Sequence, residues 1–173
     1  MFGPLILTVG HSNHELERLI ALLTANQVTA LVDVRSRPRS GFSPQFNAQP
    51  LSVALRRQGI RYVPMGDQLG GQPEDRSLWR EDRPDFAAMS QTPQLHQGLQ
   101  RLEKGIARGE RICLMCSEED PAICHRHRLL HPLIAARGID LMHVRGDGSL
   151  ERPQVTETRV PARMRRQWQQ SLL

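Results

Sequence analysis

The chain has 173 residues, of which 39% are hydrophobic and 24% charged, and 23 Lys plus Arg against 18 Asp plus Glu give a formal net charge of +5. This composition is typical of an ordinary soluble globular protein, and the length favours one domain with a self-sufficient core. No stretch reaches the roughly 18 apolar residues of a membrane span, and residues 1–10 lack the features of a signal peptide. We therefore expect a cytoplasmic protein without membrane contact.

Three cysteines, Cys113, Cys116 and Cys124, leave one thiol unpaired under any disulfide scheme. An odd number argues against a disulfide framework and favours free thiols in a reducing compartment. The positive charge is almost wholly arginine, with Lys104 the only lysine. Arginine suits bidentate contacts with carboxylate or phosphate, so the position of each arginine matters more than the total.

The first part of the chain alternates strand and helix patterns. The apolar run Leu5 to Val9 ends at Gly10 and predicts a buried strand, and the capping box Ser12 to Glu15 predicts the start of a helix. The next patterns predict a strand over 30–34, a helix over 50–58 that ends at Gly59, and a strand over 60–63.

Residues 64–84 carry many charges and glycines without an apolar period, which predicts a long surface loop. Thr92-Pro93 then predicts the start of a helix that ends at Gly109, followed by a strand over 111–115. Asp120-Pro121 predicts a further helix that ends at Gly138, with a kink at Pro132, and residues 139–144 predict a fifth strand.

Strands that alternate with helices imply right-handed crossovers. The fold class that follows is α/β, a single three-layer domain over residues 1–150 with a mainly parallel sheet of about five strands and helices on both faces. From Glu151 the chain becomes polar and arginine-rich. We expect residues 151–173 to form a basic tail that packs loosely or extends toward a partner.

In an open parallel sheet, ligands bind beyond the carboxyl ends of the strands, so the segments that follow the strands are the places to seek function. After the first strand, Gly10 lets the backbone approach a ligand, His11 is a candidate to move protons, and Ser12 begins a helix start with unpaired N–H groups that suit an anion. The alternative is a capped helix start with an incidental histidine.

After the second strand, Arg35, Arg37 and Arg39 point to one side of an extended chain and predict a concentrated anion site. Asp33 at the strand end is a candidate base or a group that orients one arginine. The alternative is an internal salt bridge with a solvated loop.

After the fourth strand, Cys116 and Cys124 are candidate thiolate nucleophiles, because a helix N-terminus and nearby cations lower a thiol pKa. His125 is a candidate acid or base and Arg126 a candidate anion clamp. The alternative is that the cysteines are small buried hydrophobes, as Cys113 should be. Its offset of three residues places Cys113 and Cys116 on opposite faces of the strand, so they are not a redox pair.

A zinc site made of Cys116, Cys124, His125 and His11 is disfavoured, because the gap of seven residues is unusual and the adjacent Cys124 and His125 should diverge on a helix. We therefore expect neither a metal nor another cofactor. A phosphatase-type thiolate loop is also disfavoured, because Ala122 stands where such a loop requires an arginine.

Five groups of residues, in the same order along the chain, resemble the domain-of-unknown-function family 488 over residues 5–145. The resemblance implies a compact α/β domain and a shared site that includes Asn47 and Glu119 as ligand-binding residues, but it implies no activity. The sequence departs from the family pattern at Ser40-Gly41-Phe42 and at Pro132. The groups are Thr8 to Ser12, Asp33 to Ser36 with Pro44 to Asn47, Gly59 to Tyr62, Leu69 to Gly71 with Pro73, and Met115 to Glu119 with Pro121 and Cys124 to Arg126.

Three hypotheses of function follow. The first, which we favour, is an enzyme for an anionic small molecule or nucleotide; a rhodanese-like sulfur transferase is a weaker form of it. The second is a nucleic-acid-binding or repair-associated module that uses residues 35–39 and the basic tail, namely Arg159, Arg163, Arg165, Arg166 and Trp168. The third is a regulatory domain that only senses an anionic ligand. The sequence leaves the oligomeric state open.

Overall fold

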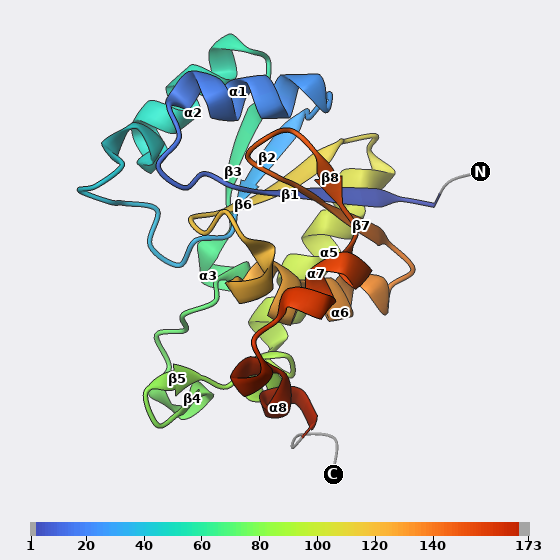
Figure 1. The fold of residues 1–173 in the computed structure, drawn as a ribbon. Coiled ribbons are helices and arrows are strands. Elements are labelled where there is room, and N and C mark those ends of the chain that lie inside the picture. The colour runs from blue at the N-terminus through green and yellow to red at the C-terminus, as the bar shows by residue number, and fades with distance from the viewer. Residues whose placement is uncertain (1–2, 170–173) are drawn as a thin grey trace.

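The protein folds around one six-stranded sheet in the order β3-β2-β6-β1-β7-β8, as a computed structural model shows (Figure 1). The structure describes the backbone of residues 3–169 and the side chains of residues 3–165. Five strands are parallel, and β8 pairs antiparallel with β7, so the predicted α/β class is confirmed with one strand more than expected. The strands are β1 (Leu5–Gly10), β2 (Ala30–Asp33), β3 (Arg61–Pro64), β6 (Ile112–Cys116), β7 (Asp140–Val144) and β8 (Leu150–Glu151).

Helices cover both faces of the sheet and make the three predicted layers. Figure 1 shows α1 (Leu16–Ala25) and α2 (Ala48–Arg57) above the sheet, with α5 (Pro93–Ala107), α6 (His131–Ala135) and α7 (Pro153–Arg159) below it. Alternate residues of a strand point to opposite faces, so Cys113 packs in the core under α1 and α2, whereas Cys116 packs in the other core. The prediction that these two cysteines point apart is confirmed.

The first residues of α5 and α1 differ in whether a side chain caps the helix as the sequence predicts. The hydroxyl of Thr92 accepts a hydrogen bond from the N–H of Leu95, as the cap at the start of α5 requires. The predicted capping box at Ser12 is wrong, because α1 begins at Leu16 and no side chain caps it. The backbone N–H of Ser12 instead donates to the carbonyl of Ser117 over 2.9 Å, which ties the loop after β1 to the loop after β6.

Residues 64–84 form short elements and not the structureless loop that we expected. Glycine permits this compact path, because a Cβ on Gly66 would lie 2.0 Å from the carbonyl oxygen of Arg35. Because these short, charged elements show no apolar period, the sequence pattern does not predict them. They are α3 (Gly66–Leu69), a 3-10 turn (Arg76–Leu78) and the hairpin of β4 (Trp79–Arg80) and β5 (Arg83–Pro84), and α4 (Phe86–Met89) follows them.

The segment after β6 is less regular than a single kinked helix. Asp120 caps a 3-10 turn (Pro121–Ile123) by accepting the N–H of Ala122 over 3.0 Å, and the chain then forms a π-helical turn (Arg126–Leu130) before α6. Pro132 lacks an N–H donor, which agrees with the wider turn just before it. The loop between Cys116 and the π-helical turn is therefore compact.

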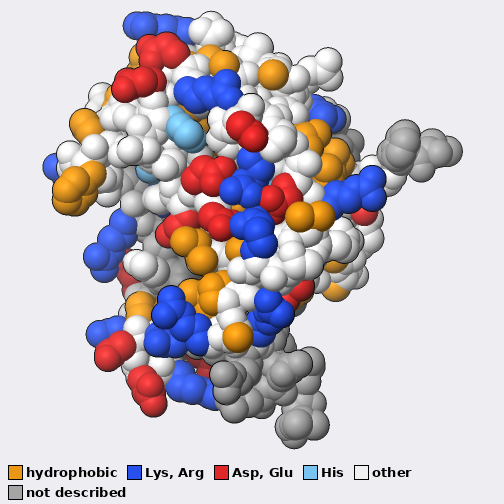
Figure 2. All heavy atoms as spheres, in the orientation of Figure 1, with side chains coloured by type: hydrophobic (Ala, Val, Ile, Leu, Met, Phe, Trp, Pro, Cys, Tyr) orange, Lys and Arg blue, Asp and Glu red, His pale blue; other side chains and the backbone are white. Residues whose placement is uncertain are grey.

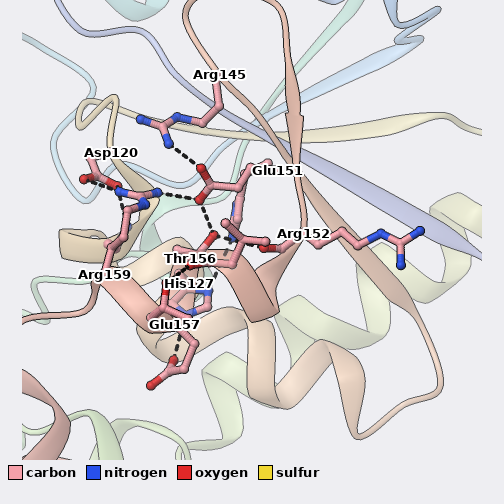
Figure 3. A network of polar contacts seen from close by, with 12 residues as sticks. Asp120, His127, Arg145, Glu151, Arg152, Thr156, Glu157 and Arg159 are labelled. Carbon is pink, nitrogen blue, oxygen red and sulfur yellow. Dashed lines mark hydrogen bonds and ion pairs between the residues drawn. The ribbon is translucent and has the colours of Figure 1, made fainter.

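The expectation of a loose tail is wrong for residues 151–160. β8 and α7 pack against β7 and the 3-10 turn after β6, and Thr156 and Val160 are buried. Figure 3 shows Glu151 between Arg145 and Arg159, and it forms ion pairs with both. A short helix, α8 (Ala162–Gln169), follows.

Acidic and basic side chains alternate over the middle of the face that Figure 2 shows. Arg145 pairs with Glu119 and Glu151, and Arg159 pairs with Asp120 and Glu151.

No helix among the described residues is long and apolar enough to cross a membrane.

We predict that Glu151→Gln lowers the free energy of unfolding by about 1–3 kcal/mol, because Arg145 and Arg159 each lose one of their two charged partners, at a side chain that is only 13% exposed. Urea denaturation measures this change. Glu17→Gln, an exposed carboxylate on α1, is the matched control and should change stability by less than about 0.5 kcal/mol. Equal effects of the two substitutions would show that Glu151 does not hold α7 in place.

Candidate functional site

Three parallel strands end side by side at one edge of the sheet. Gly10 pairs with Cys116 and Asp33 pairs with Met115, so the loops that follow β1, β2 and β6 meet there. Glycine is required at the end of β1, because a Cβ on Gly10 would lie 1.8 Å from the carbonyl oxygen of Glu118. The residues that the sequence singled out therefore do gather at the carboxyl edge of the sheet, as open parallel sheets favour.

Four side chains converge there, and we name Cys116, Cys124, His125 and Glu118 the sulfur centre. The Sγ of Cys116 lies 2.9 Å from Oε2 of Glu118, and the Sγ of Cys124 lies 3.4 Å from the same oxygen. Nδ1 of His125 lies 3.7 Å from the first sulfur and 3.8 Å from the second. Sequence reasoning assigned no role to Glu118.

The ring of His125 has a fixed orientation. Its Nε2 lies 3.1 Å from the carbonyl oxygen of Leu69, which can only accept a hydrogen bond. Nε2 therefore carries the proton, and the lone pair of Nδ1 faces the two sulfurs. Gly71 packs directly on the ring, where a Cβ would lie 2.6 Å from Cγ. The segment Leu69-Gly70-Gly71 thus positions the imidazole.

Arg126 is completely buried and points into the protein, away from the position of a substrate clamp. Its Nε donates to the Sγ of Cys124 over 3.2 Å, and its remaining hydrogen bonds go to Thr8 and to the carbonyls of Glu118 and Glu119. Among the described residues, none of its hydrogen bonds ends on a carboxylate. A buried cation needs an anionic partner, and the sulfur of Cys124 is the group placed to supply it.

The three thiols differ strongly in pKa. Burial raises the pKa of Cys124, but a hydrogen bond from Cys116 and the charge of Arg126 outweigh it and hold that pKa well below the ordinary value. The hydrogen bond to Cys124, together with burial, raises the pKa of Cys116. Burial raises the pKa of Cys113 to about 12, which agrees with its interpretation as a buried hydrophobe. Within the pair, Cys124 therefore has the lower pKa and Cys116 the higher one.

Arg35 lies in a second buried cluster and is not free to bind an anion. Its Nε and one terminal nitrogen donate to the two oxygens of Asp33 over 2.9 and 2.6 Å, so the internal salt bridge considered above describes this residue. Tyr62 also donates to Asp33, over 2.6 Å, which leaves that carboxylate no evident role as a base. Sequence reasoning missed Tyr62, although it ends one of the groups of residues that resemble the family.

His11 belongs to the same cluster. Its Nδ1 donates to the carbonyl of Ser12 over 2.7 Å, and its Nε2 accepts from Arg35 over 3.1 Å. Burial lowers the pKa of His11 to about 4, so the ring is neutral near pH 7. The ring also stacks on Phe46. His11 thus positions Arg35, and both of its nitrogens are occupied.

The other expected ligand-binding residues divide into two groups. Arg37 and Arg39 are exposed, and Arg37 lines a cleft of about 260 Å³ whose floor is the sulfur centre. Asn47 accepts the N–H of Ser40 over 2.7 Å and holds the loop after β2. Glu119 is bound by both ends of the Arg145 guanidinium, which lowers the pKa of the carboxyl. The backbone N–H of Ser12 donates to the carbonyl of Ser117 and is therefore not available to a ligand.

The basic tail contributes few free charges. Arg159 is paired with Asp120 and Glu151, and Arg165 donates to two backbone carbonyls. Arg163 is exposed. The side chains of Arg166 and Trp168 lie outside the described residues. The nucleic-acid hypothesis stays a prediction that rests on Arg37, Arg39 and Arg163.

A chain of hydrogen bonds connects the sulfur centre with α7, and no sequence signal indicated it. Arg126 donates to the hydroxyl of Thr8 over 3.0 Å, and this hydroxyl lies 2.7 Å from Nδ1 of His143. Nε2 of His143 lies 3.3 Å from Nδ1 of His127, whose Nε2 lies 2.9 Å from Glu157 on α7 (Figure 3). Arginine only donates, so in this chain each group donates a hydrogen bond to the next one outward.

A family model described as Domain of unknown function DUF488 matches residues 15–133. The chain belongs to the DUF488 family. Comparisons with curated proteins and with solved structures found no match. The matched span of this DUF488 protein contains the whole sulfur centre and the pair of Asp33 and Arg35, whereas His11 and His143 lie outside it. The resemblance is confirmed over a shorter stretch than the expected residues 5–145.

We predict that His143 makes the stability of the protein sensitive to acid. Burial, followed by the charge of Arg126, lowers its pKa to about 2. In the folded protein His143 therefore stays neutral at pH values below about 6.5, where the same side chain is protonated in the unfolded chain. The stabilisation is complete above pH 6.5 and is lost as the pH falls from there toward 2, with a slope of up to about 1.4 kcal/mol per pH unit.

His143→Gln keeps one acceptor and one donor but does not titrate. Urea denaturation between pH 6.5 and 4.5 should therefore give a shallower loss of stability for this variant than for the unsubstituted protein. Both proteins share the contributions of the other histidines, which cancel in the comparison. Equal slopes would mean that His143 binds a proton in the folded state.

Proposed function

We propose that this DUF488 protein is an enzyme that acts on a small anionic molecule, phosphate- or nucleotide-like, in the cleft above the sulfur centre. The observation that carries the proposal is the convergence of two thiols, an imidazole nitrogen and a carboxylate at the floor of that cleft. Groups of this kind that meet in a cleft beside a buried cation are typical of reacting or ligating sites. Packing alone does not require them, since Cys113 fills its core as an isolated thiol.

In this proposal Arg37 is the residue that contacts the anion. Asp33 neutralises Arg35, and Arg126 is completely buried and does not line the cleft. Arg37 is exposed at the cleft with its charge available, whereas Arg39 does not line it. A volume of about 260 Å³ suits a small ligand. A cytoplasmic location would keep both thiols reduced.

We predict that the sulfur centre is reachable from the cleft and reactive. In the native protein with EDTA present, iodoacetamide should alkylate Cys124 or Cys116 at least about tenfold faster than Cys113, which is fully buried on the other face. Mass spectrometry of each cysteine-containing peptide gives the three rates, and Cys113 serves as the internal control. If all three cysteines react together, and only as fast as the protein unfolds, the centre is a packing feature and the proposal fails.

We further predict that Arg37 attracts anions to the centre. Arg37→Ala should reduce the ratio of the alkylation rate by iodoacetate to that by iodoacetamide by about two- to fivefold, because only the first reagent is negatively charged. Arg39→Ala, an equal loss of charge on the same loop but outside the cleft, is the matched control and should leave the ratio nearly unchanged. A ratio that falls equally in both variants would reflect the net charge of the protein and would contradict a built anion contact.

A further inference from the structure

We propose that Cys116, Cys124 and His125 bind a thiophilic divalent cation of the zinc class, with the fourth position open to the cleft and the carboxylate of Glu118 beside the two sulfurs. The sulfur and nitrogen atoms of the three ligands all lie within 4.8 Å of one another. Two cysteines and one histidine are a common protein ligand set of catalytic zinc, which keeps one position open. The metal site itself does not depend on the proposed function, but an anionic occupant of the fourth position does.

The distances agree with tetrahedral coordination. Zn–S bonds of about 2.3 Å and a Zn–N bond of about 2.0–2.1 Å, set at a tetrahedral angle, place sulfur and nitrogen about 3.6 Å apart. Nδ1 of His125 lies 3.7 Å from one sulfur and 3.8 Å from the other. Only small movements of these side chains are needed to close the ligand set around an ion.

The imidazole is prepared as a ligand. Nε2 of His125 donates to the carbonyl of Leu69, so the lone pair of Nδ1 faces the two sulfurs. A hydrogen bond from the second ring nitrogen to a carbonyl is the usual support of a metal-binding histidine. Packing of Gly71 against the ring prevents it from turning away.

The charges also balance when a dication is present. Two neighbouring buried thiols resist the loss of both protons, because the two negative charges repel one another. Two thiolates and the carboxylate of Glu118 together carry three negative charges, and a dication with Arg126 supplies three positive charges. The N–H of Arg126 then donates a hydrogen bond to a sulfur that binds the ion, which orients that sulfur.

The sequence disfavoured a metal because Cys124 and His125 should diverge on a helix. Cys124 is not helical: its backbone is extended, with φ −103° and ψ 149°, and His125 is the cap residue before the π-helical turn. This change of conformation lets adjacent side chains meet. The gap between the cysteines is closed by the 3-10 turn that Asp120 caps. A bound cation would cover both sulfurs, so the loaded protein would act on the anion through the metal.

The experiment strips the full-length protein with EDTA and titrates it with Zn²⁺ and with Co²⁺. We expect one ion per chain by elemental analysis, and for Co²⁺ the sulfur-to-metal charge-transfer absorption of a thiolate site. Cys116→Ser and Cys124→Ser should each weaken binding by at least about tenfold and remove that absorption. Cys113→Ser, an identical change in the same strand but on the opposite face, is the matched control and should bind as the unsubstituted protein does.

Two further variants keep the test decisive if removal of Cys124 prevents folding, which circular dichroism would reveal. His125→Gln should also lose binding, and Glu118→Gln should bind one ion with weaker affinity while the charge-transfer absorption remains. A folded protein that binds no ion, or whose binding survives in Cys116→Ser and His125→Gln, overturns the metal site. Cysteine alkylation is measured in EDTA, without metal, so the test of the proposed function does not depend on the outcome of the metal titration.

Discussion

The structure depends on a guanidinium that is sealed inside the protein and that, among the described residues, makes no hydrogen bond to a carboxylate. Arg126 has no exposed surface, and its donors reach one sulfur, one hydroxyl and the backbone of the loop after β6. The desolvation of a buried cation costs several kcal/mol unless an anion lies beside it. The sulfur of Cys124 lies beside this guanidinium beneath the cleft, and the positive charge holds the pKa of its thiol well below the ordinary value.

The same guanidinium explains why the C-terminal segment is part of the domain. Its contact with Thr8 continues through His143 and His127 to Glu157, so the orientation of a buried group in the site is linked to a carboxylate that is 62% exposed on α7. His143 has no exposed surface and stays neutral because burial and Arg126 oppose its protonation. Residues 151–160 therefore complete a polar chain, because without Glu157 the Nε2 of the buried His127 would have lost its hydrogen-bond partner.

The sequence predicted what depends on periodicity and local caps, and it failed where the backbone conformation depends on distant contacts. The parallel strands, the start of α5 and the opposite orientation of Cys113 and Cys116 all follow from patterns of a few residues. The capping box at Ser12 was overridden by a hydrogen bond to Ser117, about a hundred residues away in the chain. The π-helical turn after Cys124 and the role of Glu118 had no local signal, so the convergence of Cys124 with His125 could not be foreseen.

Two arginines stand at this edge of the sheet, and the difference between them locates the chemistry. Arg35 is neutralised by Asp33, a carboxylate that Tyr62 also binds, so this cluster is closed and its histidine serves to hold it. Arg126 is matched by a sulfur, which is a stronger nucleophile and a softer ligand than a carboxylate. The first cluster holds the loop after β2 in place and leaves Arg37 facing the cleft. The second lowers the pKa of the Cys124 thiol beneath the same cleft, so one buried arginine fixes a loop and the other tunes a thiol.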